Sequence, residues 1–162
     1  MIHIITTGGT IEGLDIDLKV KDPKDGGVSI KDFLKAANVT LPFTIENAFK
    51  KDSREITDDD REKLTEIILA SDAKKILITH GTFTMEDTAN YLGRRSLNKT
   101  IVLVGSFTLG TEKNTDAPFN LGYAIGALQF LKPDVYIAMN GQVFHWSNVT
   151  KNIKANKFES NE

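Results

Sequence analysis

Apolar residues follow two alternating patterns along the chain. Short runs rich in β-branched residues predict buried strands at Ile2–Thr6, Lys75–Thr79, Ile101–Val104 and Val135–Met139, with Phe43–Phe49 as a further candidate. Between these runs, apolar residues recur at helical spacing in Ser29–Asn38, from Thr57 to about Ser71, from Thr84 to about Arg95, and from Leu121 to Leu131 before Pro133. The alternation predicts an α/β fold, namely a doubly wound, mostly parallel sheet with helices on both faces in three layers.

Two of the predicted helices begin with a capping signal. Thr57 precedes three aspartates. Its hydroxyl can cap the start of a helix, and the aspartate carboxylates interact favourably with the positive end of the helix dipole. Thr84 with Asp87 resembles a capping box in which aspartate replaces the usual glutamate. We therefore expect helices to begin at both threonines.

Two segments follow neither pattern. Residues 12–28 are polar and are expected to form a long exposed loop, a kind of loop that is often functional. Residues 151–162 are also polar and are expected to be frayed. The chain is therefore expected to form one domain over residues 1–150, followed by a polar C-terminal tail over residues 151–162.

Composition narrows the classes of partner and of chemistry. The 162 residues carry a net charge of −2, so there is no basic field to gather nucleic acid or an anionic membrane. The absence of cysteine excludes disulfides, thiolate catalysis and zinc ribbons. No apolar run approaches the roughly 20 residues of a membrane helix, and Met1 leads into the first strand without a signal-peptide pattern. We expect a cytoplasmic protein with no membrane or nucleic-acid partner.

Polar clusters follow two of the predicted strands, and ligands bind outside the carboxyl ends of strands in folds of this class. The clusters are TTGGT, from Thr6 to Thr10, and THGT, from Thr79 to Thr82. Glycine lets backbone N–H groups approach a ligand and a threonine hydroxyl can be a nucleophile, although TTGGT equally fits a tight turn capped by Thr10. A hydroxyl nucleophile needs a base such as a desolvated lysine, yet Lys151 taken alone is typical of a solvated surface lysine.

Other chemistries lack their motifs. The glycines of TTGGT have neither the G-x-G-x-x-G spacing nor the Gly-Lys-Ser/Thr of a phosphate-binding loop. No serine lies in a G-x-S-x-G elbow. His3, His80 and His145 lack metal-ligand spacing, so we expect no metal and no cofactor. A lone histidine such as His80 is more often a hydrogen-bonded structural residue than a base.

Five stretches together resemble signatures of the L-asparaginase/glutaminase family. They are IITTGGTI from Ile4 to Ile11, ITHGT from Ile78 to Thr82 followed by TMEDTA from Thr84 to Ala89, Val104-Gly105, DAPFNL from Asp116 to Leu121, and NVTK from Asn148 to Lys151. They occur in family order with family-like spacing and cover nearly the whole chain. The chain is therefore similar to the N-terminal catalytic domain of that family.

The resemblance implies amide hydrolysis through an acyl-enzyme. By matching position, Thr10 resembles the family's nucleophile and Thr82 its second catalytic threonine. Lys151 resembles the lysine that hydrogen-bonds to this second threonine and activates it. We expect the three side chains to converge at the carboxyl end of the sheet.

The resemblance also implies how a substrate would be held. Ser53 resembles the serine that binds the substrate's α-carboxylate. Backbone N–H groups near Gly9 and Thr82 would supply oxyanion or carboxylate contacts, which is the physical use of glycine-rich strand ends. Gly81 and Phe83 occupy the remaining substrate-binding positions of the second signature.

Three departures from the family pattern concern the substrate. The family has an aspartate at the position of Phe83, and that aspartate holds the substrate's ammonium; a missing partner for a buried ammonium costs on the order of several kcal/mol. The family supplies a tyrosine from the loop after the first signature, whereas the tyrosines here are Tyr91, Tyr123 and Tyr136. The sequence ends at Glu162, so we expect the family's smaller C-terminal domain, which completes the site from a neighbouring subunit, to be absent.

Three functional hypotheses follow from this pattern. The first is an amidohydrolase that cleaves a small amide through a threonine acyl-enzyme and is weak or redirected away from free L-asparagine. The second is a non-catalytic domain that binds a small ligand or a carboxylate. The third is a catalytic half that a separate chain completes. We expect a small amide or amino-acid-like ligand and self-association, most simply as a two-fold homodimer.

Overall fold

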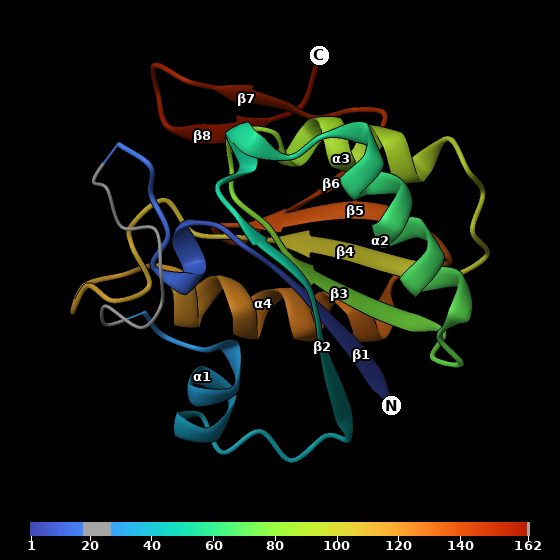
Figure 1. Ribbon diagram of the computed structural model, residues 1–162, viewed down its shortest axis with the longest axis horizontal. Coiled ribbons are helices and arrows are strands. Elements are labelled where there is room, and N and C mark those ends of the chain that lie inside the picture. The colour runs from blue at the N-terminus through green and yellow to red at the C-terminus, as the bar shows by residue number, and fades with distance from the viewer. Residues whose placement is uncertain (18–26, 162) are drawn as a thin grey trace.

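The computed structural model describes residues 1–17 and 27–161, and a six-stranded sheet lies at its centre (Figure 1). The strands are β1 (Ile2–Gly8), β2 (Phe43–Lys51), β3 (Lys75–Thr79), β4 (Thr100–Val104), β5 (Asp134–Met139) and β6 (Gln142–His145). Their spatial order is β2-β1-β3-β4-β5-β6; neighbouring strands are parallel except for β6, which pairs with β5 in the antiparallel sense. The predicted strands are present, and β6 is an additional one.

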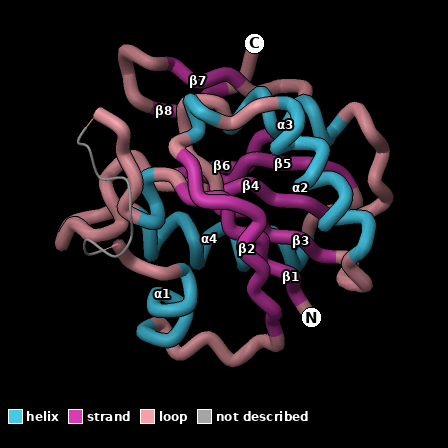
Figure 2. Tube along the Cα trace, in the orientation of Figure 1, coloured by secondary structure: helices cyan, strands magenta, loops and turns pink. Residues whose placement is uncertain are grey.

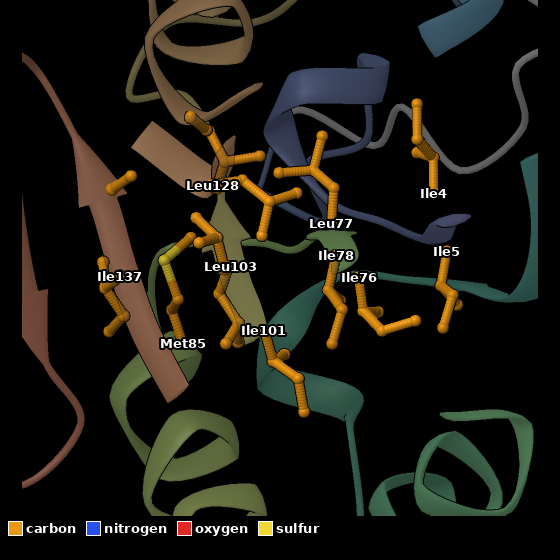
Figure 3. Close-up of a cluster of buried hydrophobic side chains, with 14 of the residues drawn as sticks. Ile4, Ile5, Ile76, Leu77, Ile78, Met85, Ile101, Leu103, Leu128 and Ile137 are labelled. Atoms are coloured by element: carbon orange, nitrogen blue, oxygen red, sulfur yellow. The ribbon is translucent and has the colours of Figure 1, made fainter. Parts of the chain in front are cut away.

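Helices cover both faces of this sheet (Figure 1). On one face lie α1 (Ile30–Ala36) and α4 (Ala117–Phe130); on the other lie α2 (Asp58–Ala70) and α3 (Met85–Gly93). Side chains alternate between the faces along each strand, so that buried Leu77 lies on the side of Leu128 and buried Leu103 on the side of Met85 (Figure 3). The three-layer α/β fold is therefore confirmed. Within the described ranges, no helix is long and apolar enough to cross a membrane.

The crossover connection through α4 is left-handed, which is the rarer hand for parallel strands. The steps from β2 to β3, from β3 to β4 and from β4 to β5 all run in the same direction across the sheet. Helices α2 and α3 nevertheless cover one face and α4 the other (Figure 1). Since parallel crossovers are right-handed in about 98% of cases, we assign the left-handed exception to β4–α4–β5. The loop that leads into α4 contacts the turn after β1, where the N–H of Gly110 donates to the carbonyl oxygen of Thr10 at 2.9 Å.

The two capping predictions had different outcomes. The Thr57 hydroxyl accepts from the N–H of Asp60, and the Asp60 carboxylate accepts from the N–H of Thr57, which confirms a capping box at α2. The capping box predicted at Thr84 is wrong. Its hydroxyl donates instead to the carbonyl oxygen of Ser53 at 2.7 Å, and no side chain caps α3. A tertiary hydrogen bond has taken the place of the local one.

Two strands lie between residues 150 and 159, so the expectation that residues 151–162 are frayed is wrong, with residue 162 outside the described residues. Strands β7 (Thr150–Asn152) and β8 (Lys157–Glu159) pair as an antiparallel hairpin outside the six-stranded sheet (Figure 2). Phe158 of β8 is buried, with its ring centroid 6.0 Å from that of Phe107. The prediction rested on the polar composition of the segment and did not take account of one buried apolar side chain, Phe158.

The segment that follows β1 is only partly exposed. Glu12 and Leu14 are buried, and residues 18–26 of the expected loop lie outside the described residues. Oε2 of Glu12 accepts a 2.7 Å hydrogen bond from the N–H of Gly8, which closes the turn after β1. Burial raises the pKa of Glu12 above its ordinary value, although the Gly8 hydrogen bond, the charge of Lys50 and the Thr79 hydroxyl oppose the change.

We predict that Glu12→Gln stabilises the protein increasingly as the pH rises. Because the pKa of Glu12 is raised in the folded state, the unfolded chain loses this proton at a lower pH than the folded protein does. The free energy of unfolding then falls as the pH rises from the ordinary glutamate pKa through the raised one. The fall is about 1.4 kcal/mol for each tenfold difference in acidity constant. Glutamine keeps an acceptor oxygen for Gly8 and has no proton to lose.

Urea unfolding at a series of pH values measures this effect. Glu66→Gln, at an exposed position of α2, is the matched control and should leave the pH dependence of unfolding unchanged. If Glu12→Gln shows the same pH dependence as the original protein, the raised pKa of Glu12 in the folded protein is disproved.

Candidate active site

The strand order places a switch point between β1 and β3. From β1 the chain goes to β2 on one side, and from β3 it goes to β4 on the other, so the connections diverge above this pair. In open α/β sheets, ligands bind at such a point, outside the carboxyl ends of the strands. In Figure 1 the arrowheads of β3, β4 and β5 point toward the side on which the turn after β1 lies. Both threonine-rich clusters therefore lie at the expected location.

Two glycines bring the clusters into backbone contact. Gly8 and Gly9 have φ values of 93° and 82°, in the left-handed region that favours glycine. A Cβ atom on Gly9 would lie 2.6 Å from the backbone nitrogen of Gly81. The Thr7 hydroxyl donates to the carbonyl oxygen of Thr79 at 2.7 Å and so ties the two strand ends together. The residues that follow Gly9 and Gly81 are therefore held close to each other.

Those next residues are the two candidate threonines. Thr10 is half-buried at the start of a 3₁₀ turn, Thr10–Glu12, and Thr82 is buried. Lys151 reaches Thr82 from β7, with its Nζ donating to the Thr82 hydroxyl at 2.9 Å. The predicted meeting of Thr82 and Lys151 is confirmed, whereas the Thr10 hydroxyl makes no hydrogen bond to either of them.

The surroundings of Lys151 make its ammonium easier to deprotonate than that of an ordinary lysine. Burial lowers the pKa of Lys151; the carboxylate of Glu86 raises it in part and the charge of Arg54 lowers it further. The backbone N–H of Lys151 donates to Oε2 of Glu86 at 2.8 Å, which fixes the strand against α3. A lysine with a lowered pKa that contacts a hydroxyl can accept a proton from it.

Phe83 lies beside this pair and is 46% exposed. The Lys151 ammonium is 4.1 Å from the centroid of its ring, and the guanidinium carbon of Arg54 is 4.2 Å from the same centroid. The ring thus contacts two cations. Phe83 has no carboxylate with which to bind a cation.

Ser53 lies against Gly81 on the side of β2. Its hydroxyl is buried and has no hydrogen-bond partner among the described residues. A Cβ atom on Gly81 would lie 2.7 Å from the Ser53 Oγ, so glycine is required for the close approach. A buried hydroxyl without a partner is costly, and a bound ligand could satisfy it.

His80 is a structural residue of the strand end. It is fully buried, its Nδ1 lies 2.8 Å from the carbonyl oxygen of Gly81, and its Nε2 lies 2.8 Å from the Thr88 hydroxyl. Burial lowers its pKa to about 4, so the ring is neutral near pH 7. A neutral imidazole with both nitrogens engaged holds the backbone of Gly81 and has no free nitrogen to act as a base.

Sequence reasoning did not single out Arg54 or Asp116. Arg54 contacts Phe83, and its position next to Ser53 was the available signal. The Asp116 carboxylate accepts hydrogen bonds from the N–H groups of Phe107 and Thr108, and these bonds outweigh burial and keep its pKa below the ordinary value. This carboxylate orders the loop whose Phe107 ring lies 5.5 Å from the Lys151 ammonium. Across residues 1–17 and 27–161, no group of three or more His, Asp or Glu side chains could hold a metal ion.

The sequence is similar to one protein family and to curated relatives of that family. The family described as Asparaginase, N-terminal matches residues 1–161, so the match includes the β7–β8 hairpin. The chain is 34% identical to a probable periplasmic L-asparaginase of Haemophilus influenzae over 93% of this chain and 46% of that protein. It is 30% identical to a glutaminase-asparaginase of Acinetobacter glutaminasificans over 94% of this chain and 50% of that protein.

Solved structures agree with the sequence comparison. A probable cytoplasmic L-asparaginase from Campylobacter jejuni superposes with a TM-score of 0.77 and 27% identity, covering 98% of this chain and 51% of that one. The thermostable L-asparaginase from Thermococcus kodakarensis gives a TM-score of 0.75 and 26% identity, covering 98% and 50%. The chain spans about half the length of the relatives it matches. On both the sequence match and the shared fold, the chain belongs to the asparaginase family and corresponds to its N-terminal domain.

Proposed function

We propose that this protein is an amidohydrolase that cleaves a small amide through an acyl-enzyme on Thr10 and acts poorly on free L-asparagine. The single observation that carries the proposal is the 2.9 Å hydrogen bond from the Lys151 ammonium to the Thr82 hydroxyl. It joins a half-buried lysine of lowered pKa to a hydroxyl at the switch point of the sheet, next to the turn that bears Thr10.

The proposed reaction has two steps that use these groups. In the first, the Thr10 oxygen attacks the amide carbon, its proton passes to the leaving nitrogen, and ammonia departs as the carbon–nitrogen bond breaks. In the second, water attacks the Thr10 ester, the carboxylic acid leaves, and Thr10 regains its proton. The neutral Lys151 amine and the Thr82 hydroxyl relay the proton in both steps. Backbone N–H groups near Gly9 and Thr82 would supply the hydrogen bonds to the developing oxyanion.

The same geometry supports a restriction on the substrate. The Ser53 hydroxyl, which has no hydrogen-bond partner in the described part of the chain, suits a carboxylate of the ligand, as the family resemblance implies. Phe83 offers a cationic group at most a cation–π contact of about 0.5–2 kcal/mol, and Lys151 and Arg54 already contact its ring. An amide without an α-ammonium therefore fits the site better than L-asparagine does.

A second candidate function is a non-catalytic domain that binds a small carboxylate. Phe83 is the observation that favours it, because the resemblance places an ammonium-binding aspartate at this position. In that case the Ser53 hydroxyl and the backbone near Gly81 would still hold a carboxylate. The two functions differ in whether ammonia is released.

The cellular compartment stays a prediction. We place the protein in the cytoplasm, and the relatives include one named periplasmic and one named cytoplasmic. Fractionation of cells that express the protein from its own gene would decide between the two compartments.

We predict that Lys151→Met lowers amide hydrolysis by about 10²–10⁴-fold, the usual contribution of a positioned acid–base group. Thr10→Ala should abolish the activity. In the original protein the rate should rise with pH through the lowered pKa of Lys151, because only the neutral amine accepts a proton. Ammonia release from succinamate, L-glutamine and L-asparagine gives the measurement, and succinamate, which lacks the α-ammonium, should be the best of the three.

Lys154→Met is the matched control, because Lys154 is an exposed lysine of the same hairpin. It should leave the rates unchanged. Hydrolysis that survives both Thr10→Ala and Lys151→Met would rule out the acyl-enzyme. If no amide is hydrolysed while succinate binds and Ser53→Ala removes that binding, the non-catalytic function is the correct one.

We further predict that the protein self-associates through the outer face of α4. The helix has no charged residue from Ala117 to Phe130, and Phe119 and Phe130 are 61% and 89% exposed. Exposed apolar side chains on a helix without charged residues are typical of an interface. Light scattering coupled to size exclusion should report a dimer for the original protein and a monomer for Phe119→Asp. Ile153→Asp, at a comparably exposed position outside α4, is the control. If the original protein is a monomer, the proposed interface is wrong.

A further inference from the structure

Arg54 is held in place at the candidate site by carboxylates from two segments. Its Nε and Nη2 donate to the two oxygens of Asp52 at 2.9 and 2.8 Å. Nη1 donates to Asp17 at 2.6 Å, and Nη2 lies 3.3 Å from Asp15. The hydrogen bond to Asp52 is the main reason that the pKa of Arg54 is raised, so the group is permanently charged. A guanidinium with so many bonds is a fixed cation.

The same guanidinium is next to the group that replaces the family's ammonium-binding aspartate. Its central carbon lies 4.2 Å from the centroid of Phe83, and the Lys151 ammonium lies 4.1 Å from that centroid. Ser53, which precedes Arg54 in the chain, packs on Gly81 of the second signature. Two protein cations therefore lie beside the position at which the family resemblance implies an ammonium-binding carboxylate.

The nearby carboxylates are already engaged. Asp15, Asp17 and Asp52 bind Arg54, and the Glu86 carboxylate accepts from the backbone N–H of Lys151. An incoming ammonium would have to displace the guanidinium from these carboxylates or approach two like charges without a partner. Like charges brought together across a binding surface cost several kcal/mol.

We propose that Arg54 is a specificity-determining residue, an internal cation that occupies the carboxylates and the aromatic ring that could receive a ligand's ammonium. The site then accepts amides whose acid part carries no cationic group, such as monoamides of simple dicarboxylic acids. This inference rests on the proposed function, because it names the substrate class of that same site.

We expect the effects of substituting Arg54 and Phe83 on ligand affinity to be non-additive. In Phe83→Asp alone, the new carboxylate lies beside Arg54 and Lys151 and is neutralised by them, so little ammonium binding is gained. In Arg54→Gln, the freed carboxylates of Asp15, Asp17 and Asp52 become available to a cation. The double variant removes the internal cation and adds the carboxylate, and should favour an α-ammonium ligand more than the two single variants would together.

Calorimetric titration with succinate and L-aspartate tests the proposal without any need for catalysis. These ligands are the products of succinamate and L-asparagine hydrolysis and differ only in the α-ammonium. The original protein should bind succinate about tenfold or more tightly than L-aspartate. Arg54→Gln should reduce or reverse this ratio, and Phe83→Asp/Arg54→Gln should reverse it furthest. Arg54→Lys keeps the charge and should keep the preference for succinate.

Arg94→Gln, which removes an exposed arginine at the end of α3, is the matched control and should leave both affinities unchanged. Equal affinities for the two ligands in the original protein would overturn the proposal, even if Arg54→Gln failed to fold. An equal change in both affinities on Arg54→Gln would also overturn it and would indicate a structural role. Preferential succinate binding without amide hydrolysis would reject the proposed enzymatic function and leave the role of Arg54 intact. Binding of neither ligand would reject both.

Discussion

The close approach of two backbone segments at the carboxyl ends of β1 and β3 is the constraint on which the candidate site depends. Gly9 lies so near Gly81 that a Cβ atom on it would meet the Gly81 backbone, and a Cβ atom on Gly81 would meet the Ser53 side chain. Two segments that are far apart in the sequence, those of Gly9 and Ser53, are therefore packed against Gly81. Because Thr10 and Thr82 directly follow the two glycines, the spacing of their main chains is fixed by this contact rather than by their own side chains.

A second set of contacts determines the charge at the site. Lys151 reaches Thr82 because β7 pairs with β8 and the Phe158 side chain anchors that hairpin. Phe83 lies against the Lys151 ammonium and the Arg54 guanidinium, so this part of the site has cations where the family resemblance leads one to expect a carboxylate. The contact between Lys151 and Thr82 is thus present although Phe83 stands at the neighbouring position in place of that carboxylate.

The strands, the helices and the location of the site could be predicted from the sequence. Apolar periodicity and a cap such as Thr57 act between residues that are close along the chain, so their pattern is visible without any tertiary information. The two threonine clusters could be located because parallel strands in this class of fold end at one edge. Lys151, Ser53 and Phe83 required the family resemblance, because nothing local distinguishes them from surface residues. Strand β6 had a local signal in Asn140-Gly141, a pair typical of a tight hairpin turn, whose φ values are 49° and 84°.

Only the tertiary structure decided which polar residues are buried or paired. Phe158 anchors a segment of polar composition, and Glu12 lies buried under the turn after β1. Arg54 contacts Phe83 and carboxylates as far away as Asp15, which is 39 positions from it in the sequence. The Thr84 hydroxyl bonds to a residue 31 positions away rather than capping its own helix. Such contacts depend on which distant segments the fold brings together. Sequence preferences that act between near neighbours carry no information about those long-range contacts.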